Sequence, residues 1–72
     1  MDFLEAALAV LGEEATPLHW TVVQDLALKR GYLDPFTQTD IRRHLLSALA
    51  AGVKAGSLEK AGTGVFALAR KP

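Results

Sequence analysis

The sequence predicts a mainly helical α+β fold, in which three helices are followed by a C-terminal β-hairpin. Apolar residues recur at helical spacing through most of residues 2–54. Two short segments, residues 57–60 and 65–68, then show apolar residues at strand spacing on either side of a Gly-Thr-Gly turn. A glycine-containing turn between two such segments is typical of a β-hairpin. We therefore expect the element order helix, helix, helix, strand, strand.

Length and composition indicate one globular domain covering residues 1–72. Half of the residues are apolar, so a core can form. A length of 72 residues is nevertheless near the lower limit for a domain that folds without a disulfide or a structural metal. The sequence has no cysteine, which excludes disulfides and thiolate metal sites. No apolar run approaches the roughly 18 residues of a membrane span, and the acidic N-terminus does not resemble a secretory signal. We expect a cytoplasmic (nucleoid-associated) or nuclear protein with no membrane partner.

The first helix is expected to begin after Asp2, because Glu5 three residues later completes a capping box. Apolar residues follow at helical spacing up to Leu11, and Gly12 then stands where a C-terminal glycine is common. Residues 16–18, Thr-Pro-Leu, are too short for a helix. We expect them to form an extended piece, the lone strand that pairs with the hairpin.

The second helix is expected over residues 20–30. Its start has two candidates, because Thr21 forms a capping box with Gln24, while His19 can also cap the helix. Its end is marked by two cations in the last turn, followed by Gly31.

The third helix is the longest and follows an Asp-Pro turn within residues 32–36. A capping pattern of Thr37 with Asp40 predicts a helix over residues 38–54, ended by Gly56. Successive residues lie 100° apart, which divides the helix into two faces. The inward face is expected to hold Ile41, Leu45, Ala48, Leu49, Gly52 and Val53. The outward face is expected to hold Asp40, Arg43, Ser47, Ala50, Ala51 and Lys54, with Arg42 and His44 at its shoulders.

The predicted core draws apolar residues from the three helices, the extended piece and the second strand of the hairpin. It contains Leu4, Leu8, Leu11, Leu18, Trp20, Val23, Leu26, Ile41, Leu45, Leu49, Val53, Val65, Phe66 and Leu68. The aromatic residues are dispersed, so we expect them in the core or at its edge and not in a base-stacking platform. They are Phe3, Trp20, Tyr32, Phe36 and Phe66. Together these elements predict a winged helix, a three-helix bundle with a helix-turn-helix and a C-terminal β-hairpin wing.

Charge is unevenly distributed, although the net charge is zero. Residues 1–38 carry six acidic and two basic residues, whereas residues 39–72 carry six basic and two acidic ones. The basic half contains the third helix and the hairpin, which suits contact with nucleic acid. The alternative is a chance division of the charges, and the neutral chain as a whole counts against strong nucleic-acid binding.

Several polar side chains of the third helix and the hairpin are candidates for DNA contacts. Arginine suits guanine or phosphate, and glutamine and threonine suit base edges. The alternative is a solvated helix face, and a turn that needs glycine only for its backbone conformation. The candidates are Gln38, Thr39, Arg42, Arg43, Ser47, Lys60 and Thr63, together with the Arg70-Lys71 tail.

No pattern in the sequence indicates catalysis. His19 and His44 lie on different predicted helices without a carboxylate at ligand spacing, so neither a metal nor another cofactor is expected. Ser47 has no base at a spacing that would activate it, and the glycines do not form a phosphate-binding loop. We expect no catalytic residues and no small-molecule ligand.

Residues spread over nearly the whole chain match a known family. They are residues 3–7, 10–11, 17–20, 29–33 and 62–68, together with Leu45 and Leu49. Through them the chain resembles the HARE-HTH family of winged helices, found in chromatin-associated proteins, restriction enzymes and the delta subunit of bacterial RNA polymerase. Residues 37–40, Thr-Gln-Thr-Asp, replace the Thr-Pro with which the family usually opens its third helix.

The resemblance implies a non-enzymatic domain that binds double-stranded DNA, in transcription regulation or to tether another activity to DNA. Binding by the isolated domain should be weak, because a neutral chain of this size neutralises few phosphates. The alternative is a protein-interaction module that docks on RNA polymerase or another transcription component. The zero net charge, the acidic first half of the chain and the alanine-rich outward face favour that alternative.

Overall fold

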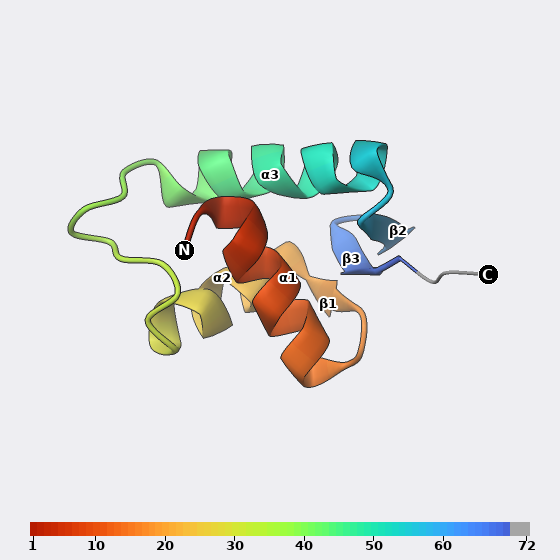
Figure 1. Ribbon diagram of the computed structural model, residues 1–72, viewed down its shortest axis with the longest axis horizontal. Helices are drawn as coiled ribbons and strands as arrows, with labels where there is room; N and C mark the ends of the chain where they lie inside the picture. The colour runs from red at the N-terminus through yellow and green to blue at the C-terminus, as the bar shows by residue number, and fades with distance from the viewer. Residues whose placement is uncertain (70–72) are drawn as a thin grey trace.

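The computed structural model describes residues 1–69 and has three helices and a three-stranded sheet (Figure 1). In chain order the elements are α1 (Phe3–Glu14), β1 (Leu18–His19), α2 (Trp20–Lys29), α3 (Ile41–Ala55), β2 (Leu58–Gly62) and β3 (Val65–Leu68). A short strand between the first two helices and a hairpin after the third give a winged-helix-like arrangement. The predicted fold class is confirmed.

The three strands form one antiparallel sheet in the order β1-β3-β2. Phe66 of β3 lies opposite Leu18 of β1 on one side and Lys60 of β2 on the other. The hairpin turns at Thr63 and Gly64, and the φ of +71° at Gly64 is a conformation that favours glycine. The predicted lone strand is present as β1, although it begins only at the last residue of the expected segment.

The N-terminus of α1 has the predicted capping box. The Asp2 carboxylate accepts a hydrogen bond from Glu5 N at 2.8 Å, and the Glu5 carboxylate accepts one from Asp2 N at 3.1 Å. The predicted end at Gly12 is wrong, because α1 continues to Glu14 and ends where Ala15 adopts a left-handed conformation. An interior glycine costs a helix only about 1 kcal/mol, and ion pairs with α2 stabilise the last turn of α1.

The cap of α2 decides between the two starts that the sequence leaves open. His19 is the N-cap, and its Nδ1 accepts a hydrogen bond from the Thr21 backbone N–H at 3.3 Å. The capping box at Thr21 is wrong, because Thr21 already lies inside the helix. The predicted end is confirmed to within one residue, with Arg30 as C-cap and Gly31 at a φ of +75°.

α3 begins three residues later than predicted, at Ile41 instead of Gln38. The Gln38 side chain accepts a hydrogen bond from Asp34 N at 2.7 Å and donates one to Met1 O at 3.3 Å. Asp40 has a left-handed conformation, with a φ of +50°, and its side chain makes no capping hydrogen bond to residues 1–69. The predicted capping pattern is therefore wrong, because contacts with the N-terminus of the chain hold this segment as a loop.

The two predicted faces of α3 are confirmed. Leu45, Leu49 and Gly52 are buried on the inward face, and all six residues predicted on the outward face are exposed. The helix ends as predicted at Gly56, which has a φ of +86°.

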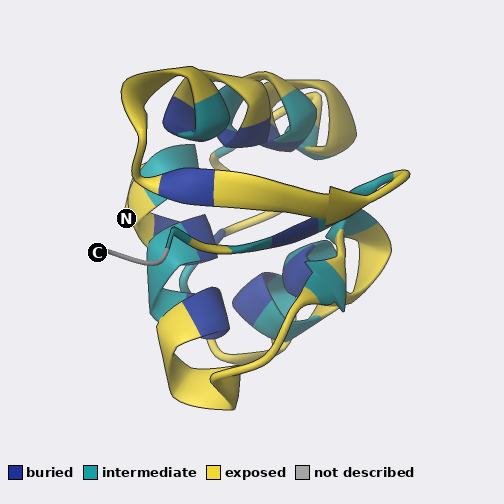
Figure 2. Cartoon of the chain, turned by 90° about the vertical axis from the view of Figure 1, so that its right-hand side faces the viewer, coloured by how far each residue is buried: buried dark blue, intermediate teal, exposed yellow. Residues whose placement is uncertain are grey.

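The core lies where α3, the sheet and the first two helices meet, and α1, α2, α3, β2 and β3 each contribute a buried segment to it (Figure 2). Most of the predicted core residues are buried or half-buried, but two predictions are wrong. Leu68 is 41% exposed because it lines an open hollow between the hairpin and the end of α1. Phe36 is 94% exposed because the loop turns at Asp34, whose carboxylate accepts a hydrogen bond from Phe36 N.

The core also contains buried residues that were not predicted, most of them small side chains or residues outside the helices. Alanines of α1 and α2 are fully buried because the helices pack closely, while a loop leucine and the first residue of β2 close the two ends. These additional core residues are Ala6, Ala7, Val10, Ala27, Leu33 and Leu58.

Candidate nucleic-acid interface

The outward face of α3 is a basic surface. α3 contains Arg42, Arg43 and Lys54 and no acidic residue, whereas α1 contains three glutamates and no basic residue. Arg43, Ser47 and Lys54 lie along one exposed stripe, and the small side chain of Ala50 lies between them. Lys54 was not among the residues predicted to contact DNA. Its position two helical turns after Ser47, on the same face, could have indicated it.

Arg43 is partly neutralised within α3. Its Nη2 lies 3.1 Å from the carboxylate of Asp40, three residues earlier. Both side chains are mostly exposed, so solvent screens the pair and it contributes little to stability. An anionic ligand therefore competes with Asp40 for Arg43.

Arg42 has a different neighbour. Its guanidinium lies over the indole of Trp20, with Cζ 5.5 Å from the ring centroid, the geometry of a cation–π contact. Trp20 is half-buried against the core at the first position of α2. The contact therefore joins the start of α3 to the start of α2. The sequence predicted Trp20 only as a core residue, so its contact with Arg42 was not predicted.

The tip of the wing is held against the start of α2. The Gly64 carbonyl accepts a hydrogen bond from Trp20 N at 2.9 Å. A Cβ at Gly64 would lie 2.8 Å from His19 Nε2, so this close approach requires glycine. Thr63 is exposed beside Gly64, and Lys60 is exposed on the edge strand β2.

Gln38 and Thr39 precede α3 instead of forming its first turn. Gln38 is half-buried, and both ends of its side-chain amide are engaged in hydrogen bonds within the chain. Thr39 has an exposed side chain, and its carbonyl accepts a hydrogen bond from His44 Nδ1 at 2.9 Å. The Gln38 amide is therefore engaged in holding the loop, and it would have to break these hydrogen bonds to contact a base. The predicted contacts of Arg70 and Lys71 lie outside the described residues.

The acidic end of α1 is partly neutralised by Arg30, the C-cap of α2, and is also contacted by Tyr32 in the loop that follows. Arg30 lies 2.7 Å from the Glu13 carboxylate and 2.5 Å from that of Glu14. The Tyr32 hydroxyl donates a hydrogen bond to Glu13, which is the main reason why the pKa of Tyr32 is raised from its ordinary value of 10.0. The hydrogen bond to Glu14 is likewise the main reason why the pKa of Arg30 is raised.

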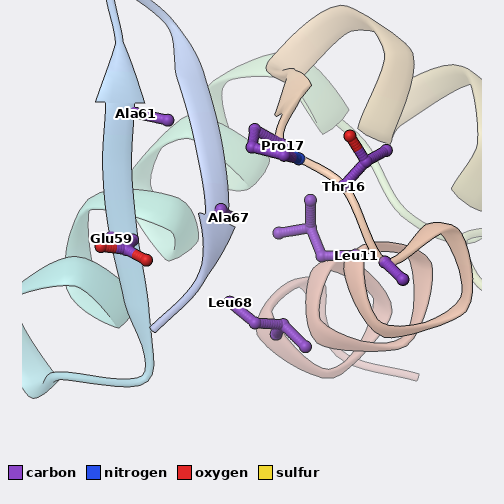
Figure 3. Close-up of a pocket in the computed structure, with 8 residues that line it drawn as sticks. Leu11, Thr16, Pro17, Glu59, Ala61, Ala67 and Leu68 are labelled. Atoms are coloured by element: carbon purple, nitrogen blue, oxygen red, sulfur yellow. The ribbon is translucent and has the colours of Figure 1, made fainter. Parts of the chain in front are cut away.

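Two surface hollows accompany these elements. One, of about 480 Å³, flanks the basic start of α3 and is lined by Asp40, Ile41, Arg42, Arg43 and Leu46. The other, of about 510 Å³, lies between the hairpin and the end of α1 (Figure 3). Its lining is largely apolar, with Thr16 and Glu59 among its few polar side chains. The first hollow belongs to the candidate interface and the second does not.

Among the described residues 1–69, no group of three His, Cys, Asp or Glu side chains is placed to hold a metal ion. Within the same range, every helix is too short or too polar to cross a lipid bilayer. Comparison of the chain with protein-family models, curated proteins and solved structures finds no match. Fold and surface together define a winged-helix-like α+β domain with a basic outward face on its third helix.

Proposed function

We propose that this chain is a non-enzymatic DNA-binding domain. α3 lies in the major groove, and the wing contacts the flanking phosphate backbone. The observation that carries the proposal is the composition of α3, in which every charged side chain is basic and the other outward residues, Ser47, Ala50 and Ala51, are small. Asp40, the acidic residue of that face, precedes the helix. Small residues such as Ser47 and Ala50 allow the helix backbone to approach the groove closely.

Binding by a single domain is weak in this proposal. Arg42, Arg43 and Lys54 of α3 and Lys60 of the wing neutralise about three or four phosphates, so the logarithm of affinity falls with the logarithm of salt concentration at a slope of about −3. Useful affinity in the cell then needs a second domain, a second copy or a protein partner. The resemblance to HARE-HTH domains supports a role in transcription regulation or in tethering another activity to DNA as part of this proposal.

An amide NMR titration with duplex DNA at low salt tests the proposal. We expect salt-sensitive shifts concentrated in residues 39–54 and 60–64. Lys54→Ala should weaken binding and reduce the salt slope by about one. Lys29→Ala is the control. It removes a charge of the same sign at the C-terminal end of α2, and it should leave the affinity for DNA unchanged. A spectrum that does not respond to DNA at low salt contradicts the proposal.

A protein-interaction module is the second candidate, and Phe36 favours it. This side chain is 94% exposed on a loop that projects beyond the start of α3 (Figure 1). Aromatic residues are common anchors of protein interfaces. In this case the partner is RNA polymerase or another transcription component, and shifts in the presence of that partner should centre on residues 34–38.

A further inference from the structure

The two adjacent arginines at the start of α3 have different surroundings. Arg43 forms an ion pair with Asp40, which cancels part of its charge and occupies one of its N–H groups. Arg42 forms no ion pair with residues 1–69 and rests on the indole of Trp20 instead. A cation–π contact uses no N–H group as a hydrogen-bond donor to an acceptor atom, so the guanidinium of Arg42 keeps its N–H groups available to a phosphate.

Trp20 also contacts the other half of the candidate interface. Its backbone N–H donates to Gly64 O at the wing tip, and a Cβ at Gly64 would lie 3.3 Å from the Trp20 ring at Cδ1. The neighbouring His19 ring is 5.7 Å from the indole and accepts from Thr21 through Nδ1. One residue therefore touches both the basic start of α3 and the tip of the wing.

We propose that Trp20 is a positioning residue, which holds the Arg42 guanidinium beside the wing tip for contact with a DNA phosphate. Arg42, and not Arg43, is then the principal electrostatic contact. The physical reason is preorganisation, because an arginine already ordered on a ring loses less side-chain freedom on binding. This inference rests on the proposed function and specifies which residues of the interface carry it.

A double-mutant cycle tests the coupling between the two side chains. Binding of a fluorescein-labelled 20-base-pair duplex is measured by anisotropy over a series of salt concentrations. We expect Arg42→Ala to lower the affinity about fivefold to tenfold and the salt slope by about one, as for loss of one phosphate contact. The matched control Arg43→Ala should lose less than about threefold, because Asp40 already offsets its charge.

The Trp20 variants separate positioning from a purely structural role. Trp20→Leu should lower the affinity about threefold to fivefold, and Trp20→Phe, which keeps an aromatic face, should recover most of it. In the Arg42→Ala background, Trp20→Leu should cause no further loss. Additive losses, or a Trp20→Leu protein that binds like the wild type, overturn the inference.

A measurement on the wild-type protein keeps the inference testable even if Trp20→Leu does not fold. In side-chain NMR spectra, DNA should shift the Nε–H signal of Arg42 more than that of Arg43. The reverse order overturns the inference while leaving the proposed function intact. Absence of any binding at low salt overturns both, so the two failures are distinguishable.

Discussion

Gly52 of α3 lies directly against Leu58 of β2, with no room for a methyl group between them. A Cβ at Gly52 would lie 2.8 Å from Leu58 Cδ1 and 3.0 Å from Cδ1 of Leu4 on α1. Both leucines pack in or against the core, so neither moves without disturbing its neighbours. This glycine allows the hairpin to fold back under α3, which sets the position of the wing.

Replacing Gly52 should therefore destabilise the fold, although alanine is the better helix former. We expect Gly52→Ala to lower the free energy of unfolding by about 1 kcal/mol, since overpacking of about 1–3 kcal/mol exceeds the gain in helix propensity. Gly12 is the matched control, because a Cβ there would lie 3.8 Å from Leu68 Cδ1, an ordinary contact. Gly12→Ala should stabilise the protein by about 0.5–1 kcal/mol. Urea denaturation measures both, and a stabilising Gly52→Ala would contradict this account.

Phe36 should contribute almost nothing to stability. Its side chain is 94% exposed, so we expect Phe36→Ser to change the free energy of unfolding by less than about 0.5 kcal/mol. Leu33, three residues earlier in the same loop, is only 2% exposed. Leu33→Ala should cost about 2–5 kcal/mol in the same denaturation experiment. A large loss at Phe36 would mean that the side chain is covered in solution.

Tyr32 should make stability fall at alkaline pH. Its pKa is raised chiefly by the hydrogen bond to Glu13, so the protonated phenol is favoured in the folded state. The resulting stabilisation is fully present below pH 10.0, the ordinary value, and is lost as pH rises through the higher pKa of the folded protein. Because Tyr32 is the sole tyrosine, its ultraviolet absorbance reports this pKa directly.

The Tyr32→Phe variant provides the control for this pH dependence. Only the phenol hydroxyl differs between the two proteins, so their comparison isolates its contribution from that of every other group. We expect the thermal midpoint of Tyr32→Phe to decline less steeply above pH 10 than that of the wild type. Identical slopes, or an absorbance titration at or below the ordinary value, would contradict the hydrogen bond to Glu13.

Removing Asp40 should strengthen DNA binding. Asp40→Asn releases Arg43 from its ion pair, and asparagine tolerates the left-handed backbone at this position. We expect about a twofold to fivefold gain in affinity at low salt, with stability changed by less than about 0.5 kcal/mol. Asp25→Asn removes the same charge from the exposed side of α2 and should give a smaller gain. Equal gains would mean that only the net charge matters.

Patterns that depend on near neighbours were predictable. The capping box of Asp2 with Glu5 and the hairpin turn at Gly64 involve residues only a few positions apart. The two faces of α3 follow from helical spacing alone, since burial of one stripe exposes the opposite one. These features need no knowledge of what the rest of the chain does.

Boundaries that depend on distant segments were not predictable. Gly12 resembles a helix end by itself, yet α1 continues past it to a last turn whose carboxylates pair with Arg30, the C-cap of α2. Gln38 suits a helix start, yet its amide is hydrogen-bonded to Met1, 37 positions away in the chain. In both cases contacts remote in sequence outweigh a local preference worth about 1 kcal/mol or less.

The sequence by itself therefore determined the order of elements, the face of α3 that turns outward and the basic character of that face. Only the tertiary structure decided which cation that face offers. Arg42 and Arg43 are identical residues side by side, but a helical step of 100° directs one toward Trp20 and the other toward Asp40. Asp40 lies three residues before Arg43, so their pairing follows from helical spacing, whereas the contact of Arg42 with Trp20 exists because α2 packs against α3. The surroundings of Arg42 are therefore decided by packing between elements and not by adjacency along the chain.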